Sequence, residues 1–239
     1  MEEALESFLD SGWITEVIGV VKSGKEATVY CCRGGEKARA ELVAAKVYRS
    51  REHRNFKNDT RYWDGYVILG SRYRRAFEKK TAFGKIVQAG LWQMREYEMM
   101  SALHEAGADI PRPIAGGESA MLMEYMGTAD AAASKLQECR PSRDIARAMY
   151  ERLMWNIELF LSKNCIHGDL SPYNILVQDD RATIIDFPQA VDPRMNRQSS
   201  ELLQRDIRNV AAYFEKYGVR DDYYRRGAEL WSRFVNGQM

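Results

Sequence analysis

The sequence lacks long apolar runs, paired cysteines and a net charge of either sign. No uninterrupted apolar run approaches the roughly 18 residues that a membrane helix needs, and the acidic start Met1-Glu2-Glu3 is unlike a signal peptide, so we expect a cytoplasmic protein without membrane contact. The four cysteines show no C-x-x-C spacing, which argues against structural zinc and against a disulfide framework. With 35 Lys plus Arg against 34 Asp plus Glu, the formal net charge of +1 provides no overall attraction to nucleic acid.

The composition is that of an ordinary globular protein. Among 239 residues, 45% are hydrophobic and 29% are charged, which excludes the disordered, collagen-like and membrane classes. At about 150 residues per domain, this length predicts one large domain or two small lobes. No internal repeat or low-complexity tract is present, so the organisation has to be inferred from periodicity and from the positions of glycine and proline.

Periodicity predicts strands first and helices later, which indicates an α+β chain. The predicted helices cover residues 1–12, 91–106, 143–163 and 201 to the end, and the predicted strands cover residues 14–21, 27–32, 42–48, 120–125, 175–177 and 183–185.

Positive charge is concentrated in residues 49–85, which we call the basic insert. It places 37 residues between a predicted strand and a predicted helix, far more than the usual loop of about 4 to 6. We expect a mobile loop that is ordered by a partner, and its hydroxyl groups are candidates for autophosphorylation: Ser50, Thr60, Ser71 and Thr81. A solvated loop is the ordinary interpretation of such a run; contact with RNA or a ribosomal particle is the alternative.

The strongest functional pattern runs from His167-Gly168-Asp169 to Asn174 and, after a predicted β-hairpin, to Asp186. Phosphoryl transfer requires an oriented nucleophile and neutralised phosphate charge. Asp169 can accept a hydroxyl proton, whereas Asn174 and Asp186 offer oxygen ligands to Mg²⁺. The order and spacing match the H-x-D-x-x-x-x-N and D-F segments of protein kinases.

Each of these residues alone would be interpreted as a turn residue, a cap or an acid at the end of a strand. Three of them at kinase spacing favour catalysis. We expect His167 to be a structural hydrogen-bonding residue, because Asp169 already occupies the position of the base.

A lysine, Lys46, lies within the apolar run 42–48. Either the strand is at an edge and Lys46 is solvated, or the lysine is buried and paired, because burying an unpaired charge is costly. The second case is similar to the kinase strand whose lysine binds the α and β phosphates and pairs with a helical glutamate. The following helix offers Glu96, with Glu98 as the fallback.

A single-glycine turn replaces the G-x-G-x-x-G loop that covers phosphates in many kinases. It contains Ser23-Gly24-Lys25 and precedes the strand of Lys46 by one strand. A Gly-Lys pair alone is weak evidence, and its position in the chain gives it meaning.

Together these segments resemble the RIO family of atypical protein kinases. The resemblance extends from about Trp13 to Val219. It is carried by Ser23-Gly24-Lys25-Glu26-Ala27, Lys46, Phe56-Lys57 in the basic insert, His167 to Asn174, Ile185-Asp186-Phe187-Pro188-Gln189 and the Leu202–Ile207 segment.

The resemblance implies a bilobal, protein-kinase-like α+β fold. We expect a β-rich N-lobe over residues 1–126 and a small helical C-lobe over residues 127–239, without an activation loop or A-P-E segment. The implied activity is serine/threonine phosphorylation with ATP and Mg²⁺ or Mn²⁺, together with ATPase activity and autophosphorylation. By the same resemblance, the catalytic residues are Asp169 and Asp186, the metal ligands are Asn174 and Asp186, and the nucleotide contacts come from Lys22, Ser23, Gly24, Lys25, Lys46, Glu96 and the hinge Glu124-Tyr125-Met126.

Two departures and two alternatives stay open at this point. Lys22 stands where relatives often have serine, and we expect the subgroup without a winged-helix domain, since none precedes Trp13. A small-molecule phosphotransferase of the aminoglycoside or choline kinase type also uses H-G-D, although only 53 residues after Asp186 leave little room for a substrate pocket. The non-enzymatic alternative is an ATP-switched RNA- or ribosome-associated assembly factor.

Overall fold

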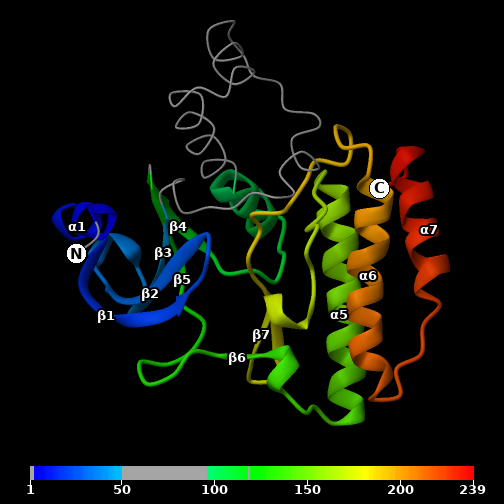
Figure 1. Cartoon of the computed structure of the whole chain (residues 1–239), viewed down its shortest axis with the longest axis horizontal. Helices are drawn as coiled ribbons and strands as arrows, with labels where there is room; N and C mark the ends of the chain where they lie inside the picture. The colour runs from blue at the N-terminus through cyan, green and yellow to red at the C-terminus, as the bar shows by residue number, and fades with distance from the viewer. Residues whose placement is uncertain (1–2, 50–95, 118) are drawn as a thin grey trace, which may run out of the picture. The chain divides into compact units, whose positions relative to one another are not determined.

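The computed structural model describes residues 3–49, 96–117 and 119–239, which form two compact units (Figure 1). The described part of the first unit covers residues 3–49, 96–101, 111–117 and 119–132; the second covers residues 102–110 and 133–239. All of the basic insert after Arg49, including its four candidate hydroxyl residues, lies outside the described residues.

A five-stranded antiparallel sheet forms the body of the first unit, in the order β1-β2-β3-β5-β4. Residues 96–105 are helical. The other elements are α1 (Glu3–Asp10), β1 (Ile14–Ser23), β2 (Ala27–Gly34), a 3-10 turn η1 (Glu36–Ala38), β3 (Leu42–Tyr48), β4 (Pro113–Gly116) and β5 (Ala120–Glu124).

Helix α1 covers this sheet because its apolar residues are spaced one turn apart. Leu5 and Phe8 are buried in the same core as Val43 and Leu122, in β3 and β5. Gly12 ends the helix in the left-handed region at φ 75°, where a residue with a Cβ atom would be strained. The helix and the sheet therefore form one core that supports the central strand β3.

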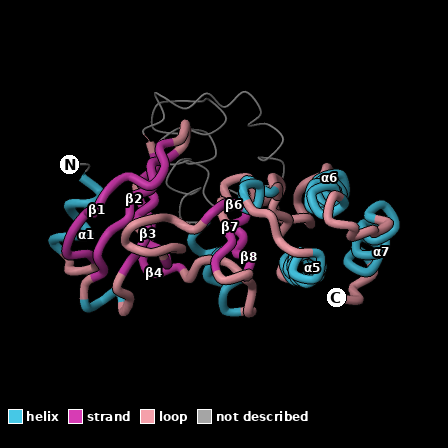
Figure 2. The backbone as a smooth tube through the Cα atoms, turned by 90° about the horizontal axis from the view of Figure 1, so that it is seen from below, coloured by secondary structure: helices cyan, strands magenta, loops and turns pink. Residues whose placement is uncertain are grey.

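The second unit combines a three-stranded sheet with three long helices. The sheet has the order β6-β7-β8, and α6 packs against both α5 and α7 (Figure 2). The elements are β6 (Ser134–Lys135), a 3-10 turn η3 (Leu136–Glu138), α5 (Arg143–Ser162), a second 3-10 turn η4 (Pro172–Asn174), β7 (Ile175–Gln178), β8 (Arg181–Ile184), α6 (Ser199–Glu215) and α7 (Tyr223–Val235).

The apolar periodicity expected for residues 143–163 is confirmed by α5. Ser142 caps the helix, since its side chain accepts a hydrogen bond from the backbone N–H of Ile145. The buried face consists of residues one turn apart, including Ala146, Met149, Leu153, Ile157 and Phe160. The long helix expected from residue 201 is interrupted instead: α6 and α7 are separated by a turn at residues 216–222.

The division into units differs from the expected boundary at 126/127 in two respects. The first unit continues to residue 132, and residues 102–110 belong to the second unit. Asp109 accounts for the second difference: its N–H donates to Asn156 Oδ1 at 2.8 Å and its carbonyl accepts from the N–H of Ile184 at 2.8 Å. Its carboxylate also binds Arg152 through two hydrogen bonds. These contacts join the segment to α5 and β8.

In the part of the chain that the structure describes, no helix combines the length and the apolar character required to cross a membrane.

Candidate active site

Lys46 lies in the middle of β3, between β2 and β5, where Val29 and Met121 are its cross-strand neighbours. The interpretation as a solvated lysine on an edge strand is therefore wrong. Lys46 Nζ lies 2.7 Å from Oε1 of Glu96, and the two side chains are only 8% and 2% exposed. Such a pair compensates the buried charge of the ammonium group and holds it in place.

Glu96 is the first of the two glutamates that the sequence offered for Lys46, and Glu98 is exposed. Two residues along a helix correspond to a rotation of about 200°, so the two side chains point in nearly opposite directions. A third residue joins the pair: the Tyr48 hydroxyl donates to Glu96 Oε2 at 2.7 Å. The sequence analysis missed Tyr48, although its spacing of two from Lys46 on a strand places it on the same face of the sheet.

The turn between β1 and β2 contains the predicted phosphate-binding residues. Gly24 N–H donates to the Ala27 carbonyl at 2.9 Å and closes the turn, and the side chains of Lys22 and Lys25 are exposed. The guanidinium of Arg49 donates to Ser23 Oγ at 2.6 Å. Arg49, immediately after β3, thus connects this turn to the strand of Lys46, within the first unit.

The predicted hinge begins at Glu124, the last residue of β5. The N–H of Glu124 donates to the carbonyl of Arg112 at 2.8 Å. In return, the N–H of Arg112 donates to Oε2 of Glu124 at 3.2 Å. Tyr125 and Met126 come next and are half-buried. Burial, together with the contact to Cys31, raises the pKa of the Tyr125 hydroxyl. The hinge residues, Lys46 and the β1–β2 turn all belong to the first unit.

Asp169 and Asn174 are brought together in the second unit, in the segment between α5 and β7. Asn174 Nδ2 donates to the backbone carbonyl of Asp169 at 2.9 Å and to its Oδ2 at 3.3 Å. Both bonds use the amide nitrogen, so the Asn174 amide oxygen is oriented away from this carboxylate and keeps its lone pairs for a cation. One carboxylate oxygen of Asp169 is thereby oriented by its neighbour.

His167 is 2% exposed, and its ring contacts the loop of Asp169 from the protein interior. Its Nδ1 accepts from the N–H of Asp169 at 3.3 Å, and its Nε2 lies 3.1 Å from the carbonyl of Ile185. An acceptor at Nδ1 and a donor at Nε2 define one neutral tautomer. The ring also packs on Phe187, with centroids 4.8 Å apart. His167 therefore connects the loop of Asp169 to the segment that carries Asp186.

Asp186 follows β8 and adopts the left-handed backbone conformation at φ 72°, which is uncommon for a residue with a side chain. Conformations of this kind cost free energy and concentrate at functional sites. Asp186 also contributes to the environment of Asp169. Desolvation raises the pKa of the Asp169 carboxyl above its ordinary value and the charge of Asp186 raises it further, while Arg205 and the Asn174 hydrogen bond oppose the shift.

Asp206 in α6 is a functional residue that the sequence analysis missed. Its side chain is buried, and its carboxylate accepts from the N–H of Gly168 at 2.7 Å and from that of Leu170 at 3.0 Å. These two amides flank Asp169. Burial raises the pKa of Asp206 to about 7, against the opposing effect of the two amides. A signal existed in the sequence, because Asp206 stands next to Ile207 on the apolar face of a predicted helix.

Asn174 and Asp186 fit a divalent cation bound jointly by the protein and by phosphate. Mg²⁺ in phosphate sites is usually held by one or two protein carboxylates or amides together with substrate oxygens. Among the residues that the structure describes, no cluster of three or more His, Cys, Asp or Glu could hold a metal without such help. The donor set is therefore suited to a metal that arrives with a nucleotide.

Comparison with known proteins agrees with this architecture. The family model described as "RIO domain" matches residues 28–226. The RIO-type serine/threonine-protein kinase Rio1 of Haloferax volcanii is 31% identical over 98% of this chain and 73% of its own length. The human serine/threonine-protein kinase RIO3 is 28% identical over 89% of this chain, which spans 41% of that protein.

The fold also resembles a solved structure, a Rio2 kinase–ADP/Mg²⁺–phosphoaspartate complex from Chaetomium thermophilum. The TM-score is 0.66 at 20% identity, with 95% of this chain and 65% of the other covered. The expected α+β, protein-kinase-like fold is confirmed by this likeness. On the match to the RIO domain and the identity to Rio1, the chain belongs to the RIO family.

Proposed function

We propose that this protein is a RIO-type kinase of the cytoplasm that transfers the terminal phosphoryl group of ATP, with Mg²⁺ or Mn²⁺, to serine and threonine hydroxyls of proteins, including its own. The observation that carries the proposal is the orientation of Asp169 by Asn174, at 2.9 and 3.3 Å. The names of the relatives, serine/threonine-protein kinases in each case quoted above, support it.

In this proposal, the residues of the second unit bind the acceptor and the cation. Asp169 accepts the hydroxyl proton through the carboxylate that Asn174 and the underlying Asp206 hold in position. The Asn174 amide oxygen and the Asp186 carboxylate would hold the cation, which when bound would neutralise phosphate charge.

The residues of the first unit orient the nucleotide. Lys46, kept charged and in place by Glu96, donates to the phosphates, and the β1–β2 turn with Ser23, Gly24 and Lys25 covers them. The hinge residues Glu124 and Met126 offer backbone groups to the adenine, in the manner that the family resemblance implies.

The test is incubation of the full chain with γ-labelled ATP and Mg²⁺, or Mn²⁺, followed by phosphopeptide mapping. We expect phosphoserine or phosphothreonine on a protein substrate such as casein and on the chain itself, and loss of both in Asp169→Asn. Parallel reactions contain choline or kanamycin in place of protein. Label in the small molecule alone would identify a small-molecule phosphotransferase, and release of inorganic phosphate alone would identify an ATPase switch; either result would overturn the proposal.

A further inference from the structure

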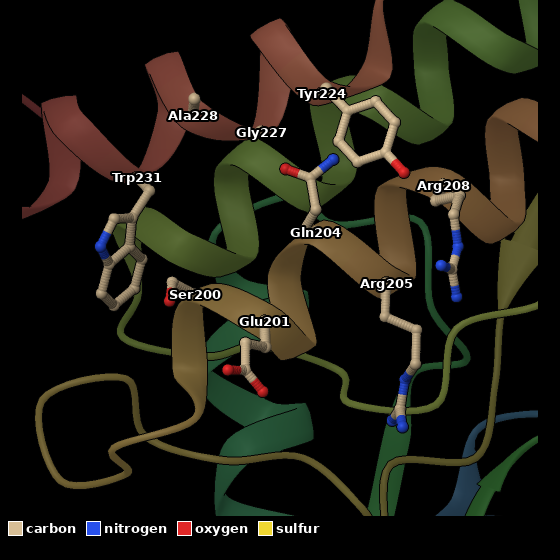
Figure 3. A pocket seen from close by; sticks show the side chains of 9 residues that line it. All are labelled: Ser200, Glu201, Gln204, Arg205, Arg208, Tyr224, Gly227, Ala228 and Trp231. Atoms are coloured by element: carbon tan, nitrogen blue, oxygen red, sulfur yellow. The ribbon is translucent and has the colours of Figure 1, made fainter.

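The second unit contains an open hollow of about 560 Å³ between α6 and α7, which we call the α6–α7 groove (Figure 3). Helix α6 contributes Glu201, Gln204 and Arg208, which lie on one face because residues three, four and seven apart share a face of a helix. Helix α7 contributes Tyr224 and Trp231 at the same spacing. None of these five side chains is assigned a role in the proposed chemistry.

Gln204 and Gly227 keep the two helices at a fixed separation beside the groove. Gly227 is buried, and a Cβ atom at this position would lie 2.2 Å from Oε1 of Gln204. Gln204 Nε2 also donates to the carbonyl of Tyr223 at 2.9 Å, so one side chain binds the start of α7 and occupies the space above its glycine. The groove is therefore preformed by a tight helix contact.

Glu201 and Arg208 place opposite charges at the two ends of the groove, and Arg205, the other charged residue of its lining, donates to the carbonyl of Gly168. Figure 3 shows Trp231 and Glu201 at one end and Tyr224 and Arg208 at the other. Arginines on the facing helix α7 form ion pairs; Arg225, for example, binds Glu229 at 2.7 Å. Within residues 3–49, 96–117 and 119–239, Arg208 has no carboxylate partner, and its guanidinium is available to a ligand.

The walls between these charges are aromatic and accessible. Tyr224 is 59% exposed, although tyrosine usually buries its ring, and the Trp231 ring is half-buried. Exposed aromatic residues beside an unpaired arginine are the residue types that dominate binding energy at protein interfaces. From Glu201 to Arg208 the helix rises about 10 Å, the length of about three extended residues. The dimensions and the lining suit a short segment of another polypeptide.

We propose that the α6–α7 groove docks a short peptide segment of a partner protein, in which an apolar side chain lies between an acidic and a basic residue. The acidic residue binds Arg208, the apolar side chain packs between Tyr224 and Trp231, and the basic residue binds Glu201. Nucleic acid is the less suitable occupant, because Glu201 would repel the phosphate backbone at one end. The proposal extends beyond phosphoryl transfer and requires neither ATP nor a functional Asp169.

Fluorescence anisotropy of a labelled probe peptide tests this. The probe has three central leucines with three glutamates on one side and three lysines on the other; control peptides replace the leucines by serines or the glutamates by lysines. The full chain should bind the probe saturably and both controls at least about tenfold more weakly. Absence of saturable binding to the probe, or equal binding to the serine control, would overturn the proposal.

Variants of the full chain assign the binding to the groove. Arg208→Glu and Trp231→Ala should each weaken probe binding about tenfold or more, whereas Arg220→Glu, the same charge change at an exposed position outside the groove, should retain it. Trp231→Phe keeps a ring and should lose less than Trp231→Ala. Arg208→Glu should leave ATP turnover unchanged, so that failure of docking and failure of the kinase proposal are distinguishable.

Two outcomes would refute the assignment. Equal losses in Arg208→Glu and Arg220→Glu would mean that net charge alone attracts the probe. Displacement of the probe by a uridine decamer, with decamer binding lost in Arg208→Glu, would make the groove a nucleic-acid site.

Discussion

The hydroxyl of Tyr48 donates to Oε2 of Glu96 at 2.7 Å, while Oε1 of the same carboxylate accepts from Lys46 Nζ at 2.7 Å. Tyr48→Phe removes this bond and keeps the ring. We expect a fall in ATP turnover of about 2- to 10-fold, because a typical intramolecular hydrogen bond makes a net contribution of roughly 0.5 to 1.5 kcal/mol. Initial rates at saturating ATP measure the effect, and an unchanged rate would show that Lys46 alone positions Glu96.

The ion pair itself should act as one unit. Lys46→Ala removes the phosphate contact and should lower turnover more than Glu96→Ala, which only releases the lysine. The double variant should be no worse than Lys46→Ala, since the second change removes nothing further. Additive losses in the double-mutant cycle would contradict a shared role.

Asp169 and Asp186 should fail in different ways. Asp169→Asn keeps the shape of the site and loses the proton acceptor, so nucleotide binding should persist while phosphoryl transfer is nearly abolished. Asp186→Ala removes a cation ligand and should weaken binding of the metal–nucleotide complex itself. Binding of a fluorescent ATP analogue with Mg²⁺, measured beside turnover, separates the two. Turnover at the parent rate in Asp169→Asn would disprove its assignment as the base.

Sequence alone predicts those parts of the site that depend on local spacing. The interval between Asp169 and Asn174 is short, and the apolar residues around Lys46 are consecutive. In the structure Asn174 binds Asp169, and Lys46 lies within a strand, as these patterns predict. Asp206 and Tyr48 were missed because their partners are 36 to 48 residues away. Local pattern places each residue on a face of its helix or strand, but it does not say which distant residue that face contacts. Sequence analysis placed residues 102–110 in the first lobe for the same reason, whereas their contacts place them in the second unit.

The contacts of Asp109 offer a stability test that separates a buried hydrogen-bond network from a surface ion pair. Asn156, 0% exposed, exchanges hydrogen bonds with the N–H and the carboxylate of Asp109, so Asn156→Leu leaves buried polar groups without partners. We expect a loss of about 1 to 3 kcal/mol in the free energy of unfolding. Arg152→Ala removes a half-exposed partner of the same carboxylate and should cost less than about 1 kcal/mol. Urea denaturation measures both, and the reverse order would contradict the network.

Asp206 should make the stability of the second unit fall as the pH rises. Its pKa in the folded chain is about 7, above the unfolded value of 3.8, because burial disfavours the charge more strongly than the amides of Gly168 and Leu170 favour it. Between these two values the folded state holds the proton that the unfolded state has lost. The stabilisation of the folded state by the proton on Asp206 is fully present below about pH 4 and is lost as the pH rises to about 7. The total change in the free energy of unfolding is on the order of 4 kcal/mol.

Because an amide does not titrate, Asp206→Asn removes this pH dependence. Any stability that the variant loses through altered hydrogen bonds to the Gly168 and Leu170 amides is the same at every pH. The difference in Tm between the parent and Asp206→Asn should therefore shrink from pH 5 to pH 8, as the parent loses its advantage. Asp180→Asn, at an exposed position in the β7–β8 turn, is the matched control and should show a flat difference across this range. A flat difference for Asp206→Asn as well would mean that the two amides hold its carboxylate ionised, and that the burial of Asp206 carries no proton into the folded state.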